Sequence, residues 1–168
     1  MPTDSELSRS QSFLKFGVWR LKLTQVSLAA LLAISCSAAP AGPPQIVVDQ
    51  TACSHCTMLV SEPAYAAAYR VPGAEARVFD DIGCLLEAMR RGGLGADADT
   101  RMWFHDADDR KWIEEDSAVF VVSSEIRTPM GGGIIAYRDA TRAEQAAARH
   151  HGRVVRSVSE LLNQKGEE

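Results

Sequence analysis

The chain has 168 residues, of which 46% are hydrophobic and 24% are charged, and its formal net charge is -4. This composition supports a hydrophobic core and excludes a chain that is disordered throughout its length. The negative charge argues against nucleic acid as a partner, because phosphate backbones are bound by basic surfaces.

The N-terminus reads as an export signal. A basic flank precedes residues 23–35, an uncharged and mostly apolar run. This run is too short for a comfortable transmembrane span and has the length of the apolar part of a secretory signal. It ends in Leu32-Ala33-Ile34-Ser35-Cys36, which resembles the lipobox of bacterial lipoproteins. We therefore expect residues 1–36 to be a lipoprotein signal peptide and Cys36 to be the lipidated first residue of the mature chain. An ordinary cleavable signal and an uncleaved anchor are the alternatives.

Residues 37–50 are expected to form a flexible tether, because their first part consists of small residues and three prolines. The folded domain is expected at residues 51–168. The mature protein would lie in the bacterial periplasm, an oxidising compartment in which disulfides persist. Three cysteines remain once Cys36 is lipidated, so at least one of them is unpaired or all three serve a metal.

The predicted elements follow an order that repeats. Strands are expected at about residues 46–48, 64–71, 76–79, 102–105, 111–115, 117–123, 133–137 and 153–156. Helices are expected from the Asp80-Asp81 pair to about Arg91, from Asp139 or Thr141 to His150 or His151, and at residues 157–164. The order strand, strand, helix, strand thus occurs twice, at about residues 64–105 and 117–156. We expect an α+β fold in which two similar ββαβ units form one compact domain.

The first predicted helix carries a cysteine, Cys84, near its start. The apolar residues of this helix recur at helical spacing and form one stripe, and Cys84 falls roughly opposite that stripe. Cys84 is therefore not expected to be a core residue. Its place in the first turn, near free backbone amides and the positive end of the helix dipole, favours a thiolate. Capping of the helix accounts for both Asp80 and Asp81.

The richest group of soft donor atoms is Cys53-Ser54-His55-Cys56-Thr57-Met58, with two thiols, an imidazole and a thioether in six residues. Sulfur ligands select soft ions such as Cu(I), and thiolates also suit Zn(II). Two later segments offer further sulfur ligands: the start of the first helix and Pro129-Met130-Gly131-Gly132-Gly133. The candidate metal ligands are Cys53, Cys56, Met58, Cys84 and Met130, with His55 as a further donor or a solvent-facing residue.

A Cys-x-x-Cys motif also has other interpretations. Cys53 and Cys56 could form a structural disulfide in a lipoprotein that binds no metal, or they could serve a thiol–disulfide oxidoreductase with Cys84 as the resolving thiol. A thioredoxin-like motif should begin a helix, and Pro63 argues against a helix after this one. The sequence contains no nucleophile elbow, phosphate loop or His-Glu-x-x-His motif, so we do not expect an enzyme.

Taken together, these motifs resemble the NosL family of copper-binding lipoproteins, which is associated with the maturation of nitrous oxide reductase. The resemblance rests on the lipobox, the 53–58 loop, Phe79-Asp80-Asp81-Ile82-Gly83-Cys84, the glycine-rich segment around Met130 and the Ala-rich helix that ends in His-Gly. It covers roughly residues 50–160. It implies two related ββαβ units and a single Cu(I) ion, with one loop cysteine, which matches Cys56, and Met130 as ligands.

The resemblance also implies a role: a membrane-anchored periplasmic metallochaperone that receives Cu(I) from a membrane copper donor and delivers it to a cuproenzyme such as nitrous oxide reductase. Ser37 after the lipidated cysteine resembles a signal for sorting to the outer membrane. The chain departs from the family in two places. Thr57 replaces a glycine of the cysteine loop, and Cys84 adds a thiol found in a branch whose recipient enzyme could differ. The family resemblance therefore supports copper binding by this chain better than it supports any particular recipient enzyme.

Overall fold

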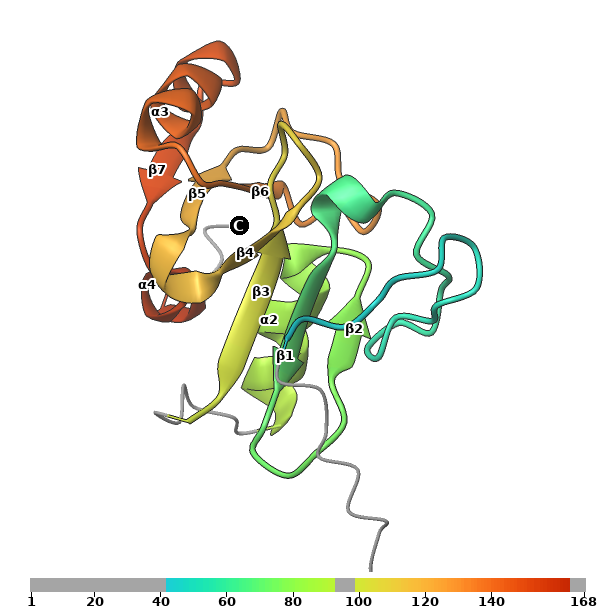
Figure 1. Cartoon of the computed structure of the whole chain (residues 1–168). Helices are drawn as coiled ribbons and strands as arrows, with labels where there is room; N and C mark the ends of the chain where they lie inside the picture. The colour runs from blue at the N-terminus through green and yellow to red at the C-terminus, as the bar shows by residue number, and fades with distance from the viewer. Residues whose placement is uncertain (1–41, 93–98, 164–168) are drawn as a thin grey trace, which may run out of the picture. The chain divides into compact units, whose positions relative to one another are not determined.

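The computed structural model describes residues 42–92 and 99–163 (Figure 1). The predicted signal peptide, the lipidation site Cys36 and the sorting residue Ser37 lie outside the described residues. Within the described part of the chain, no helix is both long and apolar enough to cross a membrane.

Two antiparallel sheets make up the described domain. The first has the strand order β2-β1-β3-β4 and the second has the order β6-β5-β7. The strands are β1 (Ala67–Arg70), β2 (Arg77–Phe79), β3 (Arg101–His105), β4 (Trp112–Glu114), β5 (Val119–Val122), β6 (Ile134–Tyr137) and β7 (Arg153–Val155). The helices are α2 (Ile82–Gly92), α3 (Ala140–Arg149) and α4 (Val158–Asn163), and two short 3-10 turns are η1 (Pro63–Tyr65) and η2 (Glu115–Ser117).

The predicted repeat of two ββαβ units is confirmed. The units are β1-β2-α2-β3 and β5-β6-α3-β7, and each places its first strand between the other two. In the first unit α2 packs near β1 and β2, as Figure 1 shows, and β4 extends the sheet on the far side of β3. Helix α3 begins at Ala140, and Asp139, one of the two expected caps, is its N-cap: the Asp139 carboxylate accepts hydrogen bonds from the N–H groups of Thr141 and Arg142.

The two sheets share one hydrophobic core. Phe104 of β3 and Phe120 of β5 are fully buried and meet edge-to-face, with 4.8 Å between their ring centroids. Backbone bonding also joins the sheets, because the N–H of Ala107 donates to the carbonyl of Ala136 at 2.9 Å. Helix α4 adds Val158 and Leu161 to the same core. The repeat therefore folds as a single packed unit, as expected.

The segment before the cysteine loop differs from the sequence-based expectation. Residues 46–48 do not form the expected strand, and a turn occupies residues 48–50. The carbonyl oxygens of Gly42 and Pro44 accept hydrogen bonds from Arg70 and Trp112, at 2.9 and 3.1 Å. Hydrogen bonds from the first sheet thus reach Gly42 and Pro44, in the segment that precedes the cysteine loop.

His105, at the end of β3, is buried, and burial lowers the pKa of its imidazole below the ordinary value. Its Nδ1–H donates a hydrogen bond to the carbonyl oxygen of Pro63. Because the folded pKa is lowered, the unfolded chain binds more protons below about pH 6.5, so this contribution to stability is present above that pH and is lost on acidification.

We therefore expect His105→Gln to flatten the decline in the free energy of unfolding between about pH 7 and pH 5, where a single histidine changes stability by at most about 1.4 kcal/mol per pH unit. Urea denaturation at a series of pH values measures this slope. The same substitution at exposed His151 is the control and should leave most of the slope in place. An equal slope in His105→Gln and the natural chain would contradict the assignment.

Candidate metal centre

The segment that carries Cys53 and Cys56 is a tight loop closed by backbone hydrogen bonds. The N–H of Cys53 donates to the carbonyl of Met58 at 2.8 Å, and the N–H of Thr57 donates back to the carbonyl of Cys53 at 3.0 Å. Thr57 closes the loop with a φ of 66°, a left-handed conformation that costs a β-branched residue about 1–3 kcal/mol. A glycine, the residue that the family resemblance implies here, would adopt this φ without strain.

Strand β2 brings the cysteine loop to helix α2. The N–H of Ser54 donates to the carbonyl of Val78 in β2 at 2.7 Å. The chain then leaves β2 through Asp80 and Asp81 and enters α2, which carries Cys84 in its first turn. Two segments about thirty residues apart in the sequence therefore meet at one end of the first sheet.

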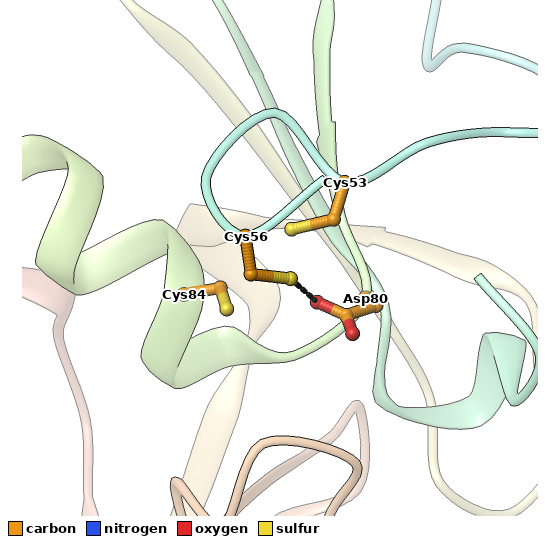
Figure 2. A group of neighbouring side chains, drawn as sticks. All are labelled: Cys53, Cys56, Asp80 and Cys84. Carbon is orange, nitrogen blue, oxygen red and sulfur yellow. Dashed lines mark hydrogen bonds between the residues drawn. The ribbon is translucent and has the colours of Figure 1, made fainter. Parts of the chain in front are cut away.

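Four side chains meet where these segments converge. They are Cys53, Cys56, Asp80 and Cys84, whose three sulfur atoms and one carboxylate oxygen all lie within 4.8 Å of one another (Figure 2). The thiol of Cys56 donates to Asp80 Oδ1 across 3.6 Å. All three cysteines are free thiols. Two sulfur ligands on one ion, each about 2.3 Å from it, lie at most about 4.6 Å apart, so the cluster can close on a single ion with small movements.

Burial controls the protonation of these thiols. Cys53 and Cys84 are 2% and 5% exposed, whereas Cys56 is only half-buried. Burial raises the pKa of the Cys84 thiol far above its ordinary value, and the neighbouring Cys53, Asp80 and Cys56 raise it further. Burial likewise raises the pKa of Cys53. The expectation that Cys84 is not a core residue is therefore wrong, and its burial opposes the thiolate that the first turn of the helix was expected to favour.

A pocket leads from the surface to the cluster. Its lining residues are His55, Cys56, Asp81, Gly83, Cys84, Glu87, Met130 and Gly132. The half-buried Cys56 and the 43% exposed Met130 thus lie on the wall of the pocket. Cys84 lines it too, so an ion that enters the pocket can reach two thiols of the cluster, those of Cys56 and Cys84.

Comparison with known proteins shows the family and the fold of the chain. The sequence model of the NosL family matches residues 44–161. This chain belongs to the NosL family. Its fold is similar to that in the crystal structure of the copper chaperone NosL from Shewanella denitrificans, with a TM-score of 0.64 and 20% sequence identity over 75% of this chain and 100% of that chain. No curated protein matches the chain.

Within this NosL chain, the structure groups some of the predicted ligands and separates one. Cys53, Cys56 and Cys84 lie together, and Met130 reaches the pocket wall. His55 lines the same pocket. Met58 does not line it and is 54% exposed, because its backbone closes the cysteine loop while its side chain faces solvent.

Asp80 is the member of the cluster that the sequence analysis missed. Capping accounted for both carboxylates before α2, but only Asp81 caps the helix, with Oδ1 accepting from the N–H of Gly83 at 2.5 Å. Asp80 is 2% exposed and faces the thiols instead. The sequence did carry a signal for this role of Asp80: one N-cap carboxylate is enough for one helix, so the second of two adjacent carboxylates is available for another role.

Proposed function

We propose that this chain is a Cu(I) carrier that holds its ion among Cys53, Cys56 and Cys84, with Met130 as a further ligand at the mouth of the pocket. The observation that carries the proposal is the convergence of three free thiols, two of which line a pocket that Met130 also lines. Thiolate and thioether ligands select soft ions, and Cu(I) is the soft ion best matched to a site with so many sulfur atoms. The similar structure described above is that of a copper chaperone.

The burial of the cluster suits a carrier rather than a catalyst. Cys53 and Cys84 are almost fully buried, whereas Cys56 is half-buried and Met130 is 43% exposed, and both Cys56 and Met130 line the pocket. A partner protein can approach the ion from the open side and replace these two ligands one at a time. The ion would thus pass between proteins without being released into water. Because a coordinated thiol must be deprotonated, loading with Cu(I) also releases protons from the cluster.

The oxidoreductase alternative is less well supported. An attacking thiol should be exposed and have a lowered pKa, so that it is a thiolate at neutral pH. Burial instead raises the pKa of both Cys53 and Cys84. Inertness of the protein in an insulin-reduction assay is the expected result, and catalysed reduction would favour the alternative.

The decisive experiment is a competition titration of the domain from residue 37 onward with Cu(I), under anaerobic reducing conditions, against bathocuproine disulfonate. We expect one tightly bound equivalent, a loss of about a hundredfold in affinity for Cys56→Ser and a smaller loss for Met130→Ala. Met58→Ala is the matched control, because its thioether faces solvent outside the pocket. No competition with the chelator would refute the copper site. A loss of Cu(I) affinity in Met58→Ala equal to that in Met130→Ala would refute the placement of the site in the pocket.

We further propose that the carrier is a periplasmic lipoprotein anchored through Cys36, in the outer membrane if Ser37 acts as a sorting residue. The lipid would keep the carrier near a membrane copper donor, and the recipient would be a periplasmic copper enzyme such as nitrous oxide reductase. The lipobox supports the anchor. Labelled palmitate should be incorporated into the natural chain and not into Cys36→Ala, and membrane fractionation should release the variant. Copper content of the recipient enzyme in a strain without this protein tests the delivery step, and normal content would contradict it.

A further inference from the structure

Two adjacent carboxylates precede helix α2, and they serve different parts of the site. Asp80 lies in the thiol cluster. Asp81 is 0% exposed and faces the glycine loop, defined here as residues 128–133, which carries Met130. A fully buried carboxylate is costly unless donors satisfy it, so its partners indicate its role.

Both oxygens of Asp81 are used to join helix α2 to the glycine loop. Oδ1 accepts the hydrogen bond from the N–H of Gly83 that caps the helix, at 2.5 Å. Oδ2 accepts one from the Thr128 hydroxyl and another, at 3.2 Å, from the backbone N–H of Met130. The Thr128 oxygen accepts in turn from the N–H of Gly133 at 3.2 Å. One buried carboxylate therefore ties both ends of the loop to the start of the helix.

The loop also touches the helix through two glycines. A Cβ atom added at Gly132 would lie 2.5 Å from Asp81 Oδ1 and 3.1 Å from the Cα of Gly83. A Cβ atom added at Gly83 would lie 3.0 Å from the Cα of Gly132. No side chain fits between the two backbones, so backbone contact and the Asp81 hydrogen bonds together fix the separation of loop and helix.

This junction sets the geometry of the mouth of the pocket. Cys84 follows Gly83 directly in the first turn of α2, and Met130 lies in the loop on the other side of the junction. Both residues line the pocket. The placement of the Met130 thioether relative to the thiols therefore depends on Asp81.

We propose that Asp81 is a positioning residue of the metal site, which holds the glycine loop so that Met130 lines the pocket beside Cys56 and Cys84, without itself binding the ion. The proposal rests on the Cu(I) site proposed above. Three hydrogen-bond donors occupy the two Asp81 oxygens, so these oxygens are not available as metal ligands. Partners that orient metal ligands in this way typically change metal affinity by about tenfold to a hundredfold when they are replaced.

The test is the Cu(I) affinity of Asp81→Asn, measured by the same chelator competition. Asparagine has the same size but replaces one acceptor oxygen with an NH2 donor, so at least one of the three donors loses its acceptor. We expect affinity to fall by about tenfold to a hundredfold. An affinity equal to that of the natural chain would overturn the proposal.

A double variant separates positioning from general damage to the fold. If Asp81 acts through Met130, the Asp81→Asn, Met130→Ala variant should bind Cu(I) about as weakly as Met130→Ala alone, because the second change removes nothing that still contributes. Losses that multiply in the double variant would overturn the proposal, since Asp81 would then act by another route.

Asp139→Asn is the matched control. Asp139 also caps a helix with its carboxylate, accepting from the N–H of Thr141 at 2.7 Å, but it lies outside the pocket. We expect its Cu(I) affinity to be unchanged. If Asp81→Asn does not fold, Thr128→Val removes the hydroxyl that bonds to Asp81 and that accepts from the N–H of Gly133, and this variant enters the same comparison with Met130→Ala. Failure of the natural chain to bind Cu(I) would refute the proposed function itself, whereas normal binding in Asp81→Asn, or in Thr128→Val where Asp81→Asn does not fold, would refute only this inference.

Discussion

Replacement of Cys84 by serine should weaken Cu(I) binding about a hundredfold. Structural zinc sites with four ligands bind with roughly 10–16 kcal/mol, which is about 3 kcal/mol, or a hundredfold, for each ligand, and the same scale is applied here to Cu(I). Cys84 is one of the two deeply buried thiols of the cluster, and a hydroxyl in its place has nearly the same shape but is a much poorer ligand for a soft ion. The loss should therefore reflect coordination rather than packing.

The measurement is competition with bathocuproine disulfonate on Cys84→Ser, with a thermal unfolding curve to show that the variant folds. Glu87→Gln is the control, because Glu87 lines the same pocket but is not part of the thiol cluster. Its affinity should stay within about twofold of the natural value. If Cys84→Ser bound as tightly as the natural chain, Cys84 would not be a ligand, and the remaining candidates would include Cys56 and Met130, the ligand pair that the family resemblance implies.

Truncation of Phe120 to alanine should lower the free energy of unfolding by about 3–5 kcal/mol, which is the usual loss for a buried phenylalanine. Phe120 is fully buried in the central strand of the second sheet and packs edge-to-face on Phe104 of the first. Because small domains are stable by only about 5–15 kcal/mol, this loss removes a large part of the total. The effect should be large because this contact joins the two ββαβ units.

Urea denaturation of Phe120→Ala, Phe104→Ala and the double variant measures both the loss and the coupling of the two rings. We expect a coupling of about 0.5–1.5 kcal/mol beyond the lost buried area. Val47→Ala, at a 50% exposed valine, is the control and should change stability by less than about 0.5 kcal/mol. Two separate unfolding transitions in the natural chain would contradict a shared core, since one cooperative transition is expected for it.

The fold was largely predictable from the sequence. Local sequence patterns indicate each ββαβ unit: short runs of β-branched and aromatic residues such as Val119–Val122, and helices with an apolar stripe. The NosL motifs then pointed to the family that the comparison confirms. The contacts of the segment before the cysteine loop were less predictable, because Gly42 and Pro44 accept hydrogen bonds from Arg70 and Trp112, which lie far along the chain.

The candidate site was predictable only in part. The soft character of the 53–58 loop is visible in its residue types, and so is the unusual setting of Met130 among glycines. The depth of Cys84 was predicted wrongly. Helical periodicity places this residue opposite the main stripe, yet the cysteine loop and the glycine loop cover that face of α2, so both faces of the helix are buried near its start.

Residue types and their spacing thus determined the two repeated units, the family and the sulfur-rich segments, because periodicity and donor chemistry are properties of short stretches of chain. Only the tertiary structure decided that Asp80 joins the thiols, that Asp81 ties the glycine loop to α2 and that Met58 faces solvent. Each of those outcomes depends on packing between segments tens of residues apart, and burial and hydrogen-bond partners of this kind leave no local pattern in the sequence.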